Sequence, residues 1–123
     1  MEAIIVYSIG EFSKIVGISE HTLRYYEREG LIKVNRDHNN VRIYSEENKL
    51  WVESILHLKN TGMSLKDMKQ FFHWGHMGDE TVEKRLALLK NHRKKVVEEL
   101  DKIRQSLEFL DNKINFYENK PSK

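Results

Sequence analysis

The spacing of apolar residues in the second half of the chain constrains its fold more than any other feature. From residue 82 to residue 117, intervals of four and three residues alternate without a break. We call these eleven positions the seam, and ten are apolar: Val82, Leu86, Leu89, Arg93, Val96, Leu100, Ile103, Leu107, Leu110, Ile114 and Tyr117. Five heptads of this pattern predict a coiled-coil helix, roughly 55 Å long at 1.5 Å per residue.

A helix of this length cannot bury its seam on the 78 residues that precede it. We therefore predict a homodimer in which the seam meets the same helix of a second chain, with folding back onto its own head as the alternative. The expected dimerisation helix covers residues 79–120, and residues 121–123 are expected to form a disordered tail. The residues expected to carry dimerisation are Val82, Leu86, Leu89, Val96, Leu100, Ile103, Leu107, Leu110 and Ile114.

Composition narrows the function classes. The chain has 123 residues and no cysteine, which excludes disulfides, thiolate metal sites and thiol redox sensing. No apolar run approaches the length of a membrane span, so we expect a cytoplasmic protein without a membrane partner. No nucleophile–base or paired-acid spacing indicates an enzyme, and we expect no cofactor and no bound metal.

Two short helices joined by a tight turn are predicted near the N-terminus. Ser8 is placed to cap the first helix, with Glu11 at the capping-box position, and Gly17 ends it. Ser19 caps a second helix that runs to about Glu29. This spacing is typical of a helix-turn-helix motif, although two short helices of any bundle would look similar.

A β-hairpin is predicted directly after these helices. Residues 31–34 and 41–44 are β-prone, and residues 35–40 between them are rich in turn formers. Ser45 and Ser64 then cap two further helices, the first closed at residues 61–62 and the second by Gly75 and Gly78. Their expected core residues are Leu50, Trp51, Ile55 and Leu58, then Leu65, Met68, Phe71 and Phe72. The predicted fold class is mainly α, with a winged helix-turn-helix head over residues 1–78.

The chain resembles the MerR family of bacterial transcriptional regulators in its compact form, without a separate effector domain. Four segments carry the resemblance: residues 7–12 (YSIGEF), 23–32 (LRYYEREGLI), 42–45 (RIYS) and 59–65 (KNTGMSL). The resemblance implies a homodimer with an antiparallel coiled coil that places each second helix in a major groove of a pseudo-palindromic operator. It also implies control of transcription by distorting promoter DNA, with RNA polymerase as a further partner.

Net charge alone argues little for DNA, because it is only +2. The case rests on particular side chains. His21 and Thr22 are expected to meet base edges, and Arg24 and Tyr25 match positions that the family uses for DNA contacts. The remaining candidates are Arg36 and His38 at the wing tip, and Arg42 and Tyr44 at the wing-to-helix junction, of which one could be structural. Lys59 and Lys66 are candidates too, at the two ends of the segment around residues 59–65 that resembles the start of the family's second wing region.

No residue pattern identifies an effector, so a small-molecule effector stays unknown. His57 lies near the place where compact relatives often carry a cysteine, which argues against covalent sensing of electrophiles. His73 and His76 could bind a metal, but packing or surface histidines are the more common use. An aromatic pocket near Trp51 and Trp74 is a further alternative to a plain core. Competing functions are an architectural or excisionase-like DNA-bending protein and an interaction scaffold.

Overall fold

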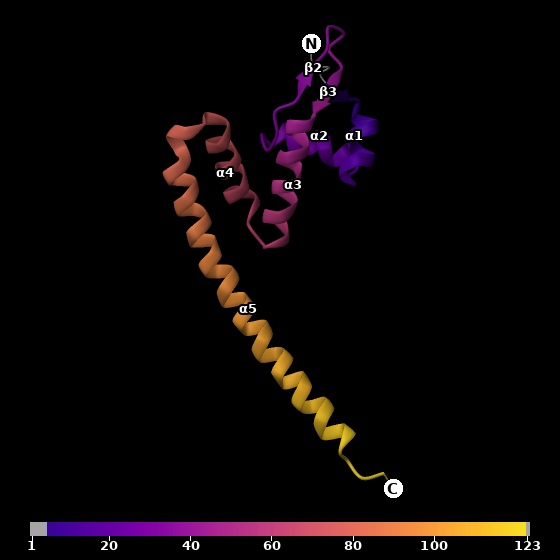
Figure 1. The fold of residues 1–123 in the computed structure, drawn as a ribbon, viewed down its shortest axis with the longest axis vertical. Coiled ribbons are helices and arrows are strands. Elements are labelled where there is room, and N and C mark those ends of the chain that lie inside the picture. The colour runs from indigo at the N-terminus through magenta and orange to yellow at the C-terminus, as the bar shows by residue number, and fades with distance from the viewer. Residues whose placement is uncertain (1–4, 123) are drawn as a thin grey trace. The chain divides into compact units, whose positions relative to one another are not determined.

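The computed structural model describes residues 5–122 and is mainly helical, as the sequence predicts (Figure 1). Its elements are β1 (Val6–Tyr7), α1 (Ile9–Val16), α2 (Glu20–Arg28), β2 (Asn35–Arg36), β3 (Arg42–Ser45), α3 (Glu46–Asn60), α4 (Leu65–Met77), the 3₁₀ turn η1 (Asp79–Thr81) and α5 (Val82–Glu118). The chain forms two compact units, one up to Leu88 and the other from Leu89 onward. Of the expected tail, Lys123 lies outside the described residues.

The helix-turn-helix prediction is confirmed by the capping geometry of α1 and α2. The Ser8 side chain accepts from the Glu11 backbone N–H while the Glu11 side chain accepts from the Ser8 N–H, which forms a capping box. Gly17 ends α1 with φ of 71°, a left-handed conformation that glycine adopts without strain. Ser19 then caps α2 through the Thr22 N–H, so that only a short turn separates the two helices.

The wing is a hairpin, but its first strand lies later than predicted. The strand is Asn35–Arg36, paired antiparallel with β3, and not residues 31–34. Leu31 and Ile32 are instead buried in the core, 0% and 2% exposed. The turn is tighter than expected because the Asp37 carboxylate accepts backbone N–H groups at 2.8 and 3.0 Å, which moves the paired residues closer to it.

A third strand, β1, was not predicted from the sequence. Val6–Tyr7 pairs antiparallel with the other edge of β3, which gives the strand order β1-β3-β2. The Tyr7 hydroxyl also donates a hydrogen bond to the Glu46 carboxylate at the start of α3. These contacts attach the N-terminal segment to the middle of the head.

The caps of α3 and α4 are confirmed, whereas three details of these helices were predicted wrongly. Ser45 and Ser64 accept from the backbones of their helices, as expected. Leu50 is 64% exposed and Leu65 37% exposed, so neither is a core residue. α4 also continues through Gly75 to Met77 before Gly78 ends it.

The core of the head draws on α1, α2, β3, α3 and α4, and both α1 and α3 contact β3 (Figure 1). The Phe12 and Tyr44 rings stack with centroids 4.6 Å apart, which joins α1 to β3. The buried apolar residues are Phe12, Leu23, Tyr26, Leu31, Ile32, Tyr44, Val52, Ile55, Met63, Met68 and Phe72. This packing fixes the orientation of α2, whose outer face is the main candidate for function.

The long helix is present as predicted and buries none of its described residues. α5 runs unbroken from Val82 to Glu118 (Figure 1). Each apolar seam residue except the half-buried Val96 exposes at least 36% of its surface. An apolar stripe of this length on a single chain is a surface that a partner is expected to cover.

Candidate nucleic-acid interface

α2 presents a polar outer face because its inner face is held by the core. Leu23 and Tyr26 are buried, whereas His21 and Arg24 on the opposite side are exposed. Thr22 is half-buried, and its hydroxyl accepts a hydrogen bond from Ser19 Oγ at 2.9 Å. One acceptor site of this hydroxyl is therefore already used within the N-cap of α2. The exposed residues near the start of α2 are those that a recognition helix uses to reach base edges.

Arg24 is accessible for a contact outside the protein. Its guanidinium forms an ion pair with the Glu20 carboxylate, one helical turn earlier, at 3.5 Å. Both side chains are about half exposed, at 45% and 46%, and exposed pairs of this kind contribute about 0.3–0.5 kcal/mol. A phosphate or a guanine edge can therefore displace Glu20 at little cost.

Arg28 is a candidate that the sequence-based prediction missed. It is exposed, and its guanidinium lies 5.6 Å from the centre of the Tyr25 ring. Its position, four residues after Arg24, places it on the same outer face of α2. This helical spacing is a signal that could have identified it together with Arg24 and Tyr25.

The two wing arginines converge on one glutamate of α2. Arg42 Nε lies 2.6 Å from Glu27 Oε1, and Arg36 Nη2 lies 3.6 Å from Glu27 Oε2. The hydrogen bond to the Glu27 carboxylate raises the pKa of Arg42 above its usual value. The sequence-based prediction named both arginines but not the acid that holds them, because pairing between residues 27 and 42 depends on the fold.

His38 and Tyr44, the other two wing candidates, have opposite environments. His38 is exposed in the turn, where Asn40 adopts a φ of 62° that favours Asn or Gly. Tyr44 is 0% exposed, and burial raises the pKa of its hydroxyl. We therefore correct the prediction for Tyr44: its ring is a core element stacked on Phe12 and is not available for DNA contact.

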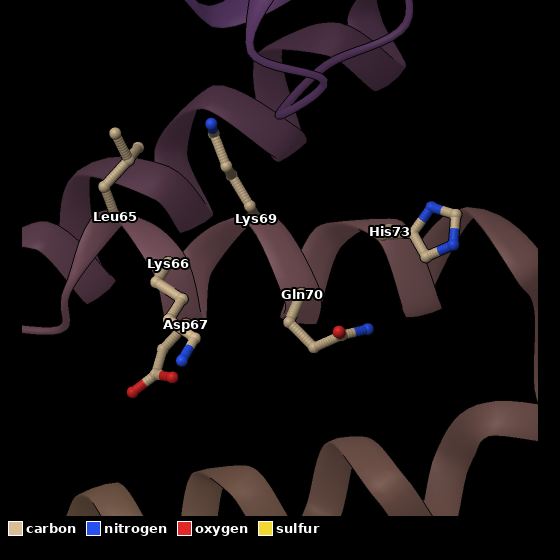
Figure 2. A pocket seen from close by; sticks show the side chains of 6 residues that line it. All are labelled: Leu65, Lys66, Asp67, Lys69, Gln70 and His73. Atoms are coloured by element: carbon tan, nitrogen blue, oxygen red, sulfur yellow. The ribbon is translucent and has the colours of Figure 1, made fainter.

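Lys59 and Lys66 flank the turn between α3 and α4, and both are exposed. Met63 anchors this turn from within because it is buried in the core. Figure 2 shows that Lys66 and Gln70 extend to one side of α4, whereas Lys69 extends to the other. Lys69 Nζ lies 2.5 Å from Glu29 Oε2, just after the end of α2, and this hydrogen bond raises the pKa of Lys69. Lys69 thus braces α2, while Lys66 is left for an outside partner.

His57, His73 and His76 lie in different environments. His57 and His73 are exposed, whereas the His76 ring stacks on Trp51 with centroids 4.4 Å apart. Burial lowers the pKa of His76, and its Nε2 atom has no hydrogen-bond partner within the described structure. Across residues 5–122, no group of three or more His, Cys, Asp or Glu side chains is arranged to hold a metal ion.

A shallow hollow occupies part of the region where an aromatic pocket was considered. Its lining residues are Leu50, Trp51, Ser54, Phe71, Phe72, Gly75 and Arg85. Trp74 is absent from this lining and instead has Lys84 Nζ 5.9 Å from its ring. Trp51 packs against Phe72 and His76, so its indole serves the core of the head at least in part.

Comparison with known proteins identifies the family. The model of the MerR HTH family regulatory protein matches residues 7–73, and the model described as MerR, DNA binding matches residues 51–113. An uncharacterised HTH-type transcriptional regulator of Haemophilus influenzae is 38% identical over 113 residues, which cover 91% of this chain and 84% of the relative.

No helix among residues 5–122 is both long and apolar enough to cross a membrane.

Solved structures agree with the family models. HiNmlR, a MerR family regulator lacking the sensor domain and solved bound to promoter DNA, superposes with a TM-score of 0.82 at 37% identity, covering 93% of this chain and 91% of its own. A MerR family regulator from Bacillus thuringiensis superposes with a TM-score of 0.77 at 34% identity. The match covers 92% of this chain and 100% of that regulator. These likenesses favour a regulator over an architectural DNA-bending protein. The chain belongs to the MerR family of DNA-binding transcriptional regulators.

Proposed function

We propose that the protein binds a pseudo-palindromic promoter operator as a homodimer, with α2 of each copy in a major groove. The observation that carries this proposal is the outer face of α2, where His21 and Arg24 are exposed opposite the buried Leu23 and Tyr26. Tyr25, Arg28 and the wing arginines extend the same polar surface. The solved complex of HiNmlR with promoter DNA supports this assignment for a chain 37% identical to it.

The seam supports an antiparallel pairing of two α5 helices. The seam has five positions on each side of Leu100, so an antiparallel helix centred there places every position within one residue of a seam position of its partner. In that register Val82 lies opposite Tyr117, Leu86 opposite Ile114, and Leu89 opposite Leu110. Only Arg93 breaks the apolar pattern, and it lies opposite Leu107. The exposed stripe of α5 is therefore long enough and regular enough for a second copy to cover.

We further propose that the dimer acts on transcription by distorting the DNA, with RNA polymerase as the partner that responds. If the distance between the two α2 helices of the dimer differs from the half-site spacing of undistorted DNA, both half-sites are bound only when the DNA between them changes shape. Operator fragments with the site at varied positions would test this through their gel mobility. Bending predicts a mobility that depends on the position of the site, and equal mobility at all positions would contradict it.

Selection from a random-sequence duplex pool is the experiment that tests DNA recognition itself. Rounds of mobility shift with the full chain are expected to enrich two inverted half-sites. Arg24→Ala should fail to enrich the same sequence, because Arg24 lies on the exposed face of α2. If selection with the wild-type protein enriches no sequence, that result would contradict sequence-specific binding and favour a protein-interaction scaffold.

A further inference from the structure

We propose that Glu27 is an internal counter-anion for the wing, which holds Arg36 and Arg42 until DNA phosphate shares them and thereby limits binding to DNA of any sequence. The inference rests on the proposed function, since it assigns a specificity-determining role within the same interface. Glu27 belongs to the recognition helix, yet its carboxylate contacts the wing and not the outer face of α2.

The pairing register of the wing explains why a counter-charge is needed. Arg36 and Arg42 are direct partners across β2 and β3, so their side chains leave the same face of the hairpin. Like charges directly opposite each other destabilise an antiparallel pair. The Glu27 carboxylate binds both guanidinium groups, one through each oxygen, and so neutralises this repulsion.

Burial indicates which partner of this cluster can turn outward. The Glu27 side chain is 20% exposed, less than that of Arg42 at 30% or Arg36 at 36%. A guanidinium has five N–H donors, and Arg36 uses one further donor on the Asn40 carbonyl at 3.3 Å. Donors are therefore left on the accessible side of both arginines, where a phosphate oxygen can bind them.

The charge balance predicts how the wing affects DNA binding. Two arginines and one glutamate leave a single net positive charge in the cluster, and removal of the carboxylate would leave two. Each additional phosphate neutralised by a protein steepens the dependence of log affinity on log salt by about 0.9. Glu27 therefore lowers the contribution of the wing to the affinity for DNA of any sequence. Base contacts from α2 then account for a larger share of the total affinity, which increases the preference for the operator over other sequences.

The test compares wild type with Glu27→Gln, which keeps the shape of the side chain and removes its charge. The affinity for a duplex of random sequence is measured by fluorescence anisotropy across a range of potassium chloride concentrations. We expect binding to tighten by roughly fivefold to tenfold near 0.1 M salt and the salt slope to steepen by about one unit. Unchanged or weaker binding with an unchanged slope would overturn the inference.

Glu53→Gln is the matched control, because it removes the same charge from an exposed position on α3. It corrects for the change in net charge, and we expect it to shift the slope far less. A control effect equal to that of Glu27→Gln would also overturn the inference. A merely structural role for Glu27 would lower the melting temperature and the affinity together without steepening the slope.

A second pair of variants keeps the test decisive if Glu27→Gln alone does not fold. Arg36→Gln removes one of the two opposed charges, so Glu27→Gln can be added in that background without leaving the arginines unpaired against each other. The double variant should bind random duplex more tightly than Arg36→Gln, and equal binding would overturn the inference. A wild-type protein that binds no DNA would instead contradict the proposed function itself.

Discussion

Leu100→Glu is expected to dissociate the proposed homodimer. Leu100 keeps 45% of its surface exposed on the single chain, and burying a whole leucine contributes about 1.5–3 kcal/mol. Loss of the Leu100 side chain therefore reduces the free energy of dimerisation by about 1 kcal/mol per copy, or about 2 kcal/mol per dimer. In the register centred on Leu100, the two new carboxylates also face each other at the symmetry axis. Desolvating them brings the total to on the order of 5 kcal/mol, which weakens the dimer by about three to four orders of magnitude.

Sedimentation equilibrium at micromolar concentration measures this change directly. Wild type is expected to sediment as a dimer and Leu100→Glu as a monomer with an unchanged head. The matched control is Gln105→Glu, which adds the same charge to the same helix at an exposed position away from the seam. A monomeric wild type would refute the reasoning, as would a control that dissociates as fully as Leu100→Glu.

Four further outcomes follow from the site. Arg24→Ala should lose about 1–3 kcal/mol of operator affinity in a titration at fixed salt while its melting temperature stays within a few degrees of wild type, and undiminished affinity would show that α2 is misplaced. Lys59→Ala should weaken binding to all sequences alike and make the salt slope shallower by about one unit, whereas a changed base preference would contradict a phosphate contact. Because burial lowers the pKa of His76 in the folded state, stability should be full above its unfolded pKa and fall as pH drops through that value; thermal melts should show a smaller loss for His76→Gln, and an equal loss would exclude this cause. With no thiol in the chain to modify, exposure to formaldehyde or diamide should leave promoter transcription unchanged, and a stable adduct on His57 in the intact-mass spectrum that switches transcription would contradict this.

Local signals were read correctly from the sequence because they depend on few neighbouring residues. Ser8, Ser19, Ser45 and Ser64 each cap the helix that follows, and the side chain of each accepts a hydrogen bond from the backbone N–H of the third residue of that helix. The seam was equally visible, because its spacing depends only on the helical period. These features define the helix-turn-helix and α5 without any knowledge of packing.

Contacts between distant residues were not predictable in the same way. β1 pairs Tyr7 with Tyr44, far along the chain, and two residues carry too little pattern to indicate a strand. Asn48 is buried because its amide donates to the Lys33 carbonyl at 2.8 Å, a partner that only the fold supplies. Leu50 was assigned to the core because α3 has apolar residues on more than one face, and helical spacing alone does not choose between them.

The same distinction between local signals and contacts of distant residues applies to the candidate site. The exposed residues of α2 follow from its helical period, which separates them from Leu23 and Tyr26. Whether Tyr44 faces DNA or the core could not be predicted, because alternation along β3 gives Arg42 and Tyr44 the same side. The structure separates them by depth: the Arg42 side chain is 30% exposed beside Glu27, and Tyr44 is buried on Phe12.

In the proposed complex, two copies of this chain bind two half-sites through their α2 helices. The most direct measurement is the stoichiometry and affinity of the full chain on its selected operator, compared with duplexes in which either half-site is scrambled. We expect two chains per operator and an equal loss of affinity from scrambling either half-site. One chain per duplex, or full affinity with one half-site scrambled, would contradict it.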